Sequence, residues 1–166
     1  SYTGNSSSVN YSGSVYIYYK DIDLGWKEEI RLIPSDFAND YLFGNTVKLT
    51  DNKLLVGAPY KNTKNGSVYL YTYTNGTWIE RQIMTATDPA NNKEYGWSLD
   101  ISDDGKVYAI GAPFSNSSAT GKVHFITDEN ANIIISEGQT LLASDAEYAD
   151  RFGYSVAISG DGSRII

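Results

Sequence analysis

Hydrophobic and polar residues alternate with a period of two along most of this chain. Residues 15–18, 47–49 and 155–158 follow the alternation closely, and this is the pattern of a β-strand with one buried face. No stretch carries apolar residues at the 3.6-residue spacing of an amphipathic helix. The alternation therefore predicts an all-β protein.

Turn-forming residues divide the chain into repeated groups of four strands. Short turns rich in Asp, Asn and Gly supply the positive backbone dihedrals that tight hairpins need. They occur between first and second strands at 51–52, 103–105 and 160–162, and between third and fourth strands at 23–25, 75–76 and 130–132. Longer connections occupy 60–65 and 114–120 between second and third strands, and 35–42, 88–94 and 144–151 between units. In an up-and-down sheet these longer connections emerge at one end, so we expect them to form one common face.

Three short sequence features recur with one period. An aromatic-glycine pair begins at Phe43, Tyr95 and Phe152, at intervals of 52 and 57 positions. A Gly-Ala-Pro segment occupies residues 57–59 and 111–113, and a Gly-x-Val segment begins at Gly13, Gly66 and Gly121. One unit is therefore about 55 residues long, slightly longer than the range of four-stranded propeller blades.

Repeated four-stranded antiparallel sheets predict a β-propeller, in which each sheet is a blade. The chain holds about three blades' worth of sequence as a single array, split at both termini: a half blade at 1–35, blades at 36–87 and 88–143, and a half blade at 144–166. We expect the glycines of the Gly-Ala-Pro segments to lie where the sheets crowd toward the axis.

These features together resemble the FG-GAP repeat, the blade unit of integrin alpha-subunit propellers and of related bacterial and eukaryotic surface proteins. The resemblance rests on Phe43-Gly44 with residues 57–59, on Tyr95-Gly96 with residues 111–113, and on residues 152–162. It covers essentially the whole chain. It implies a propeller whose long-loop end binds proteins in adhesion or recognition.

The short turns depart from that family in one respect. Its blades often carry a calcium loop with carboxylates at alternate positions. The corresponding turns here, 50–53, 102–106 and 159–163, are shorter and hold fewer carboxylates, and Asp21 with Asp23 lacks a third acid. We therefore expect no cofactor and no calcium site.

Catalytic residues are scarce. The single histidine, His124, stands where Tyr16 and Tyr69 stand in the other units, which favours a packing role in a strand. No nucleophile elbow, phosphate-binding loop or zinc-binding helix motif is present. We therefore expect that the protein is not an enzyme.

Composition and charge limit the classes of partner that the protein can bind. A net charge of −7 argues against nucleic acid, whose phosphates demand a basic surface. No apolar run reaches membrane-spanning length, so no membrane insertion is expected. Asn-x-Ser/Thr sequons at Asn5, Asn10, Asn65, Asn75 and Asn116 favour an extracellular or cell-surface location. The chain has no cysteine, which excludes disulfides.

The expected strand order leaves part of a blade at each end of the chain. Exposed strand edges recruit partners, so we expect a homo-oligomer, and a homodimer would close a ring with six blades, a common number. A trimer would give nine. The alternative is that the chain is a fragment of a longer propeller. The residues expected to close strands between chains are Val15, Tyr16, Ile17, Val156, Ile158, Ile165 and Ile166.

The resemblance implies that the chain is a non-enzymatic module for protein interaction or adhesion, with a protein or glycan as its ligand. The binding residues expected on the long-loop face are Tyr60, Lys61, Asn62, Lys64, Phe114, Asn116, Asp40 and Asp150. Asp36, Asp88 and Asp145 recur at one loop position, either as local caps or as a ring of acids. Two alternatives remain: a purely structural self-assembling repeat, and an accessory domain of a surface hydrolase.

Overall fold

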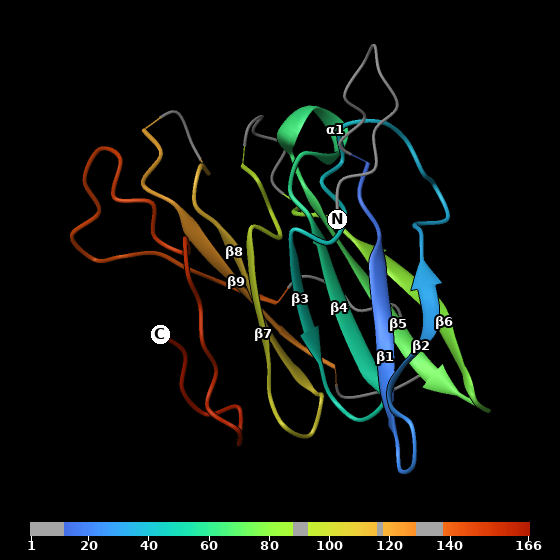
Figure 1. Cartoon of the computed structure of the whole chain (residues 1–166). Helices are drawn as coiled ribbons and strands as arrows, with labels where there is room; N and C mark the ends of the chain where they lie inside the picture. The colour runs from blue at the N-terminus through green and yellow to red at the C-terminus, as the bar shows by residue number, and fades with distance from the viewer. Residues whose placement is uncertain (1–11, 88–92, 116–117, 129–137) are drawn as a thin grey trace.

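Three antiparallel sheets follow one another along the chain in the computed structural model, which describes residues 12–87, 93–115, 118–128 and 138–166 (Figure 1). The first sheet pairs β1 (Val15–Asp21) with β2 (Gly25–Leu32). The second has the order β3 (Thr46–Leu49), β4 (Lys53–Ala58), β5 (Ser67–Thr74), β6 (Thr77–Met84). The third joins β7 (Ser98–Ile101), β8 (Val107–Ala112), β9 (Lys122–Thr127) and β10 (Gln139–Leu141). The predicted all-β class is confirmed.

Two short segments complete the described chain. The segment α1 (Lys61–Lys64) is a single turn in which Asn62 and Thr63 have left-handed dihedrals rather than those of an α-helix. After the third sheet, residues 157–166 fold back on themselves. The backbones of Ala157 and Ile166 exchange two hydrogen bonds of 2.9 Å, and Ile158 forms an antiparallel bridge with Ile165.

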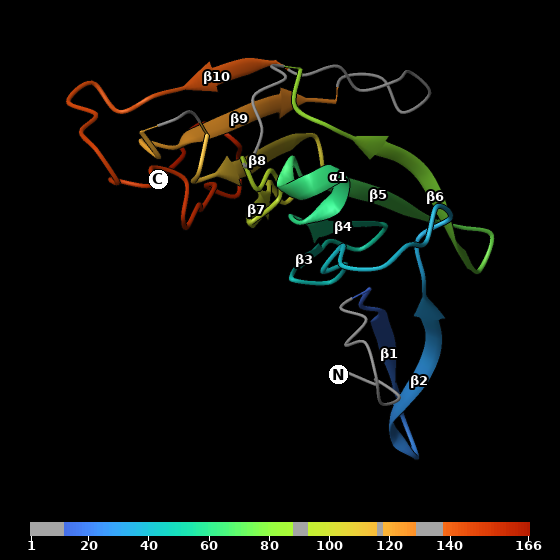
Figure 2. The same cartoon turned by 90° about the horizontal axis from the view of Figure 1, so that it is seen from above.

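The sheets are stacked face to face and fan out from one side of the molecule (Figure 2). Their first strands lie on the inner side, where β3 packs beside β7. Because the second sheet has a neighbour on both faces, its central strands are buried on both sides. Leu54 and Val56 of β4 pack against Val15 of the first sheet, whereas Leu55 belongs to the core shared with the third sheet.

The backbones of consecutive units touch directly, and we call this contact the joint. Gly66, which begins the third strand of one unit, forms a parallel bridge with Tyr95 of the next unit, and Tyr95 N–H donates to the Asn65 carbonyl at 3.1 Å. A Cβ added to Gly66 would overlap with the backbone oxygen of Tyr95. The same joint recurs between Gly13 and Phe43 and between Gly121 and Phe152.

The Gly-Ala-Pro segment takes part in the same joint. A Cβ on Gly57 would overlap with the carbonyl oxygen of Gly96, and one on Gly111 with that of Gly153. These glycines therefore face the loop of the next unit. Neighbouring sheets therefore approach closely at these glycines, which explains the need for a residue without a side chain.

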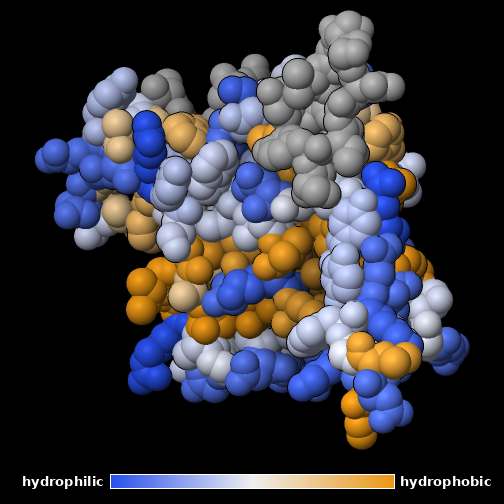
Figure 3. All heavy atoms as spheres, viewed as in Figure 1, coloured by the Kyte–Doolittle hydropathy of each residue, from blue (hydrophilic) through white to orange (hydrophobic). Residues whose placement is uncertain are grey.

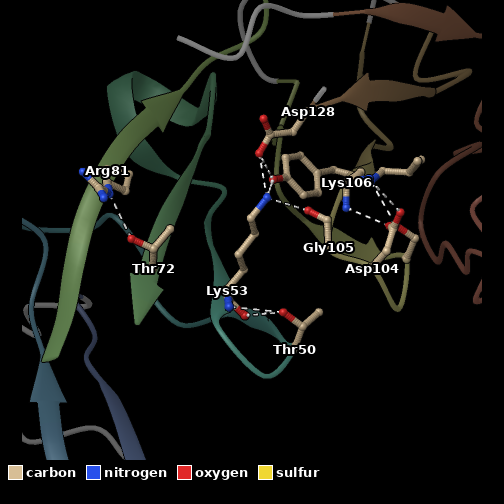
Figure 4. A network of polar contacts seen from close by, with 11 residues as sticks. Thr50, Lys53, Thr72, Arg81, Asp104, Gly105, Lys106 and Asp128 are labelled. Atoms are coloured by element: carbon tan, nitrogen blue, oxygen red, sulfur yellow. Dashed lines mark hydrogen bonds and ion pairs between the residues drawn. The ribbon is translucent and has the colours of Figure 1, made fainter. Parts of the chain in front are cut away.

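Polar side chains also tie the units together (Figure 4). The Lys53 ammonium reaches from β4 into the third sheet, where it contacts Asp128 Oδ2 at 2.7 Å, the Gly105 carbonyl at 2.7 Å and the Tyr108 hydroxyl at 3.0 Å. On the inner side, the Asp100 carboxylate pairs with Lys48 of the second sheet at 3.0 Å and accepts Ile158 N–H at 2.7 Å. Each network spans consecutive units and fixes their relative position.

Replacing Gly66 with alanine tests the backbone joint. Gly66→Ala places a methyl group on the Tyr95 backbone at a φ of +84°, so we expect a loss of at least about 3 kcal/mol in the free energy of unfolding. Gly76→Ala is the matched control, because its φ is +77° and nothing lies within 4 Å of the added carbon. The control should lose only about 1 kcal/mol. Urea denaturation measures both, and equal losses would contradict a steric role for the joint.

Candidate functional site

The longer connections gather at one end of the molecule, the upper end in Figure 1, as predicted from the strand order. We call this end the long-loop face and define it as residues 35–42, 60–65, 93–97, 113–115, 118–120, 142–151 and Tyr154. The short hairpin turns, such as the one between β3 and β4, lie at the other end.

Strained backbone is concentrated on the long-loop face. Non-glycine residues with positive φ are uncommon, and they cluster at functional sites. Of those that the structure describes, all but Asn75 lie on this face: Asp40, Leu42, Asn62, Thr63, Lys64, Glu94, Ala119, Ala149 and Arg151. The loops are therefore held in defined, costly conformations.

One loop of this face is fastened by a partly buried ion pair. Lys61 contacts Asp36 from the preceding connection, and its ammonium lies 3.0 Å from the Tyr69 hydroxyl. Tyr69 donates a hydrogen bond to Asp36 Oδ1 at 2.7 Å. Burial alone would raise the pKa of Asp36, but the hydrogen bonds from Lys61 and Tyr69 outweigh it, so the pKa is lowered from its ordinary value.

Lys61 was predicted to be a binding residue, and its burial contradicts a place on the open surface. Only 5% of the residue is exposed, and its ammonium contacts Asp36 and the Tyr69 hydroxyl. The Asp36 carboxylate likewise stabilises a loop by pairing with Lys61, so it does not belong to a ring of unpaired acids. Asp145 is exposed, and Asp88 lies outside the described residues.

The other predicted binding residues differ in their surroundings. Lys64 is exposed, with its ammonium 4.5 Å from the centre of the Tyr60 ring, and Asn62 is exposed beside it. Asp40 is exposed. Asp150 is exposed too, and its carboxylate accepts Glu147 N–H at 2.6 Å within its own turn. Asn116 lies outside the described residues.

Phe114 belongs to an aromatic cluster that joins two units. The Trp97 ring is 6.1 Å from that of Phe114 and 5.4 Å from that of Tyr154. The Arg151 guanidinium lies 5.0 Å from the Phe114 ring centre, the geometry of a cation–π contact. Arg151 and Tyr154 are exposed, whereas Trp97 and Phe114 are half-buried.

A buried carboxyl group lies beside this aromatic cluster. Glu94 is 7% exposed, and its Oε2 has no hydrogen-bond partner. Burial raises the pKa of Glu94, and the positive charges of Lys64 and Arg151 only partly offset that rise. The face therefore combines aromatic rings, an exposed arginine and an unsatisfied acid, contributed by loops of successive units.

Sequence reasoning did not assign Trp97, Tyr154, Arg151 or Glu94 to the binding face. A signal was present, because Trp97 and Tyr154 both directly follow the glycine of an aromatic-glycine pair. An aromatic ring repeated at that position, together with the common long-loop end, was sufficient to place both on one surface.

His124 occupies a packing position, in line with the expectation from the repeat. It is buried in β9 with its ring 5.0 Å from that of Tyr95, edge to face. Tyr69 has the same relation to Phe43 in the preceding unit, at 5.1 Å. The histidine therefore replaces a tyrosine within a repeated aromatic contact.

The short turns use their carboxylates locally. Asp161 accepts hydrogen bonds from the Ser159 hydroxyl and the Ser163 backbone, and these lower its pKa to about 2. In the equivalent turn, Asp104 Oδ1 accepts hydrogen bonds from the Ser102 hydroxyl and from Lys106 N–H. Within the described ranges, no group of three or more His, Cys, Asp and Glu residues could hold a metal ion.

The residues predicted to close strands between chains serve the core of this chain as well. Val15 and Ile17 are buried between the first and second sheets, and Tyr16 lies under the Arg31 guanidinium. Val156 is buried against the third sheet with Ile158 and Ile165 beside it, whereas Ile166 is 89% exposed.

Comparison with known proteins identifies the repeat. The family model of the FG-GAP repeat matches residues 26–71, 78–126 and 135–166. Integrin alpha-2 of Bos taurus is 29% identical over 175 residues, a match that covers 92% of this chain and 15% of that protein. The chain therefore spans a small part of this relative's length.

The Asp36–Lys61 ion pair should make the free energy of unfolding depend on pH in the acidic range. A carboxyl whose folded-state pKa is lowered stabilises the fold above its ordinary pKa, and this contribution is lost as the pH falls through the folded value. Asp36→Asn should cost about 0.5 to 1 kcal/mol at pH 7, since solvent screens this partly exposed carboxylate, and should flatten the decline in unfolding free energy below pH 4. Asp40→Asn, an exposed change in the same loop, should do neither. An unchanged acid dependence in Asp36→Asn would contradict the assignment.

Proposed function

This chain belongs to the FG-GAP repeat family, and from that membership we propose that it is a non-enzymatic module for protein interaction of the adhesion type. Its similarity to an integrin alpha subunit supports the adhesion role and an extracellular or cell-surface location. In the part of the chain that the structure describes, no helix is both long and apolar enough to span a bilayer. Fold alone does not specify function, so the proposal depends on the surface described next.

The aromatic cluster with Arg151 is the observation that carries the proposal. Protein interfaces are enriched in Trp, Tyr and Arg, and a few such residues near the centre of an interface supply most of the binding energy. Trp97, Phe114 and Tyr154 form a contiguous group, with Arg151 stacked on one ring. The strained loops around them are already ordered, so binding would not have to bear the full entropy cost of ordering them.

A non-enzymatic role is supported by the way the acid–base groups are used. His124 packs in a strand, Asp36 holds a loop, and the turn carboxylates bond to their own backbone. Glu94 has a raised pKa, but a general acid or base also needs a partner group that positions it against a substrate. Its neighbours Lys64 and Arg151 suit recognition of a charged partner.

Loss of two rings from the aromatic cluster should weaken partner binding. Ligands are first identified by passing the protein over an array of recombinant ectodomains and glycans, and their affinities are then measured by surface plasmon resonance. The double variant Phe114→Ala, Tyr154→Ala should weaken capture at least tenfold. Leu24→Ala is the control, because Leu24 is 70% exposed at the hairpin turn between β1 and β2. Ligands bound equally by the wild type and the double variant would contradict a binding role for this face.

A second candidate function is self-association through β1. Among the strands that the structure describes, β1 pairs with β2 alone. Strand edges without a partner attract further strands. Figure 3 shows a hydrophobic band that runs from the C-terminal segment over β7 and β3 toward β1. Val47 and Leu49 of β3 are 45% and 58% exposed there. A second copy pairing with β1 would cover part of this band.

Self-association through β1 predicts both a mass and a protection pattern. Sedimentation velocity should show twice the 18.3 kDa chain mass as the concentration rises. Hydrogen exchange should slow in β1 over the same concentration range, while amides of the outer strand β6 stay unchanged. A monomer throughout, or protection gained in β6 instead of β1, would contradict this second candidate.

A further inference from the structure

A groove lies at the end of the molecule opposite the long-loop face. One wall belongs to the first sheet, and the other belongs to the second sheet and the turn between β3 and β4 (Figure 1). Its volume is about 660 Å³, which is within the range of ligand-binding pockets. It shares no residue with the aromatic cluster around Phe114, so it can be tested separately.

Each wall of this groove contributes two aromatic rings and one carboxylate. Tyr18, Tyr19 and Glu29 come from the first sheet. Tyr73, Trp78 and Asp51 come from the second sheet and its turn. We call these six residues the tyrosine groove. The Tyr73 and Trp78 rings are 5.2 Å apart, so the second wall presents a continuous aromatic surface.

A β-bulge in β2 places Glu29 beside the tyrosines of β1. The pairing of β1 with β2 passes from Ile17–Ile30 to Tyr18–Glu28, so Glu29 is the extra residue of the bulge. A bulge re-aims the side chain at its position, and Glu29 lines the groove together with Tyr18 and Tyr19. Both rings remain largely accessible, with 51% and 44% of these residues exposed.

The charge in the tyrosine groove is uniformly negative. No lysine or arginine is among the residues that line it. Three lysines close in sequence to lining residues are paired elsewhere: Lys27 with Asp21, Lys48 with Asp100 and Lys53 with Asp128. Lys20 directly follows Tyr19 but does not line the groove. The negative charge of Glu29 raises the pKa of the Tyr73 phenol on the opposite wall. The carboxylates therefore face aromatic rings, with no cation from the groove lining to balance them.

We propose that the tyrosine groove docks an extended segment of a partner protein through an arginine side chain. A guanidinium stacks on aromatic faces and binds carboxylates in a two-pronged fashion, so it satisfies both kinds of lining group at once. A lysine ammonium would meet the charge but use the flat rings less well. A neutral sugar could stack on the rings, but it would desolvate Glu29 and Asp51 without compensating their charge.

The test uses a hexapeptide library with one fixed central arginine and an otherwise identical library with citrulline, which keeps the shape and removes the charge. Binding is followed by NMR of protein labelled in the tyrosine rings. The arginine library should shift the signals of Tyr18, Tyr19 and Tyr73 and bind at least tenfold more tightly than the citrulline library. Raising the salt concentration from 50 to 500 mM should weaken that binding severalfold.

Two charge-neutralising variants locate the site. Glu29→Gln should reduce affinity for the arginine library about tenfold. Glu28→Gln removes the same charge one position away, from an exposed residue that does not line the groove, and should leave affinity unchanged. Equal binding of both libraries, no effect of Glu29→Gln, or ring shifts caused by a neutral oligosaccharide but not by the arginine library would overturn the proposal. The Phe114→Ala, Tyr154→Ala variant should bind the library normally, which separates this site from the long-loop face.

Discussion

The backbone contact between the glycine that starts a third strand and the aromatic-glycine pair of the next unit is the constraint on which this structure depends. Gly66 against Tyr95 leaves no room for a side chain, and the same holds for Gly13 against Phe43 and for Gly121 against Phe152. Because this contact brings sheets together at one end, the aliphatic faces between them can close into cores. The side-chain ties from Lys53 and Asp100 then hold the sheets at the other end and along the inner side.

The strands and their order could be predicted from the sequence, because the information is local. Alternation, tight turns and the recurrence of short motifs at one interval specify a repeated hairpin sheet without knowledge of any long-range contact. Burial on both faces of β4 was less visible, since Leu54, Leu55 and Val56 form an unbroken apolar run. The repeat resolved that ambiguity, because a sheet between two neighbours must be apolar on both sides.

The candidate site could be predicted only in outline. The common end of the long loops follows from strand direction. Whether each side chain is buried or exposed there depends on partners distant in sequence. Lys61 is buried because Asp36 and Tyr69 converge on it, and the sequence gives no sign of that convergence. Trp97 and Tyr154 meet because consecutive units are stacked, so the cluster belongs to the assembly of units. The bulge at Glu29, which lines the tyrosine groove beside Tyr18 and Tyr19, is likewise a consequence of strand pairing.

The joint between units also governs the loops that carry the candidate binding residues. Leu42, Glu94 and Arg151 each directly precede an aromatic-glycine pair and have φ values of 53°, 53° and 56°. Glu94 N–H donates to the Lys64 carbonyl at 2.9 Å, and Arg151 N–H donates to the Ala119 carbonyl at 3.1 Å, so these two strained residues are bonded to the preceding unit. Stacking of the sheets thus supplies the free energy that holds these loops in uncommon conformations. It follows that a change which loosens the joint should disorder the long-loop face before it unfolds the sheets, because the hydrogen bonds that hold Glu94 and Arg151 are part of the joint.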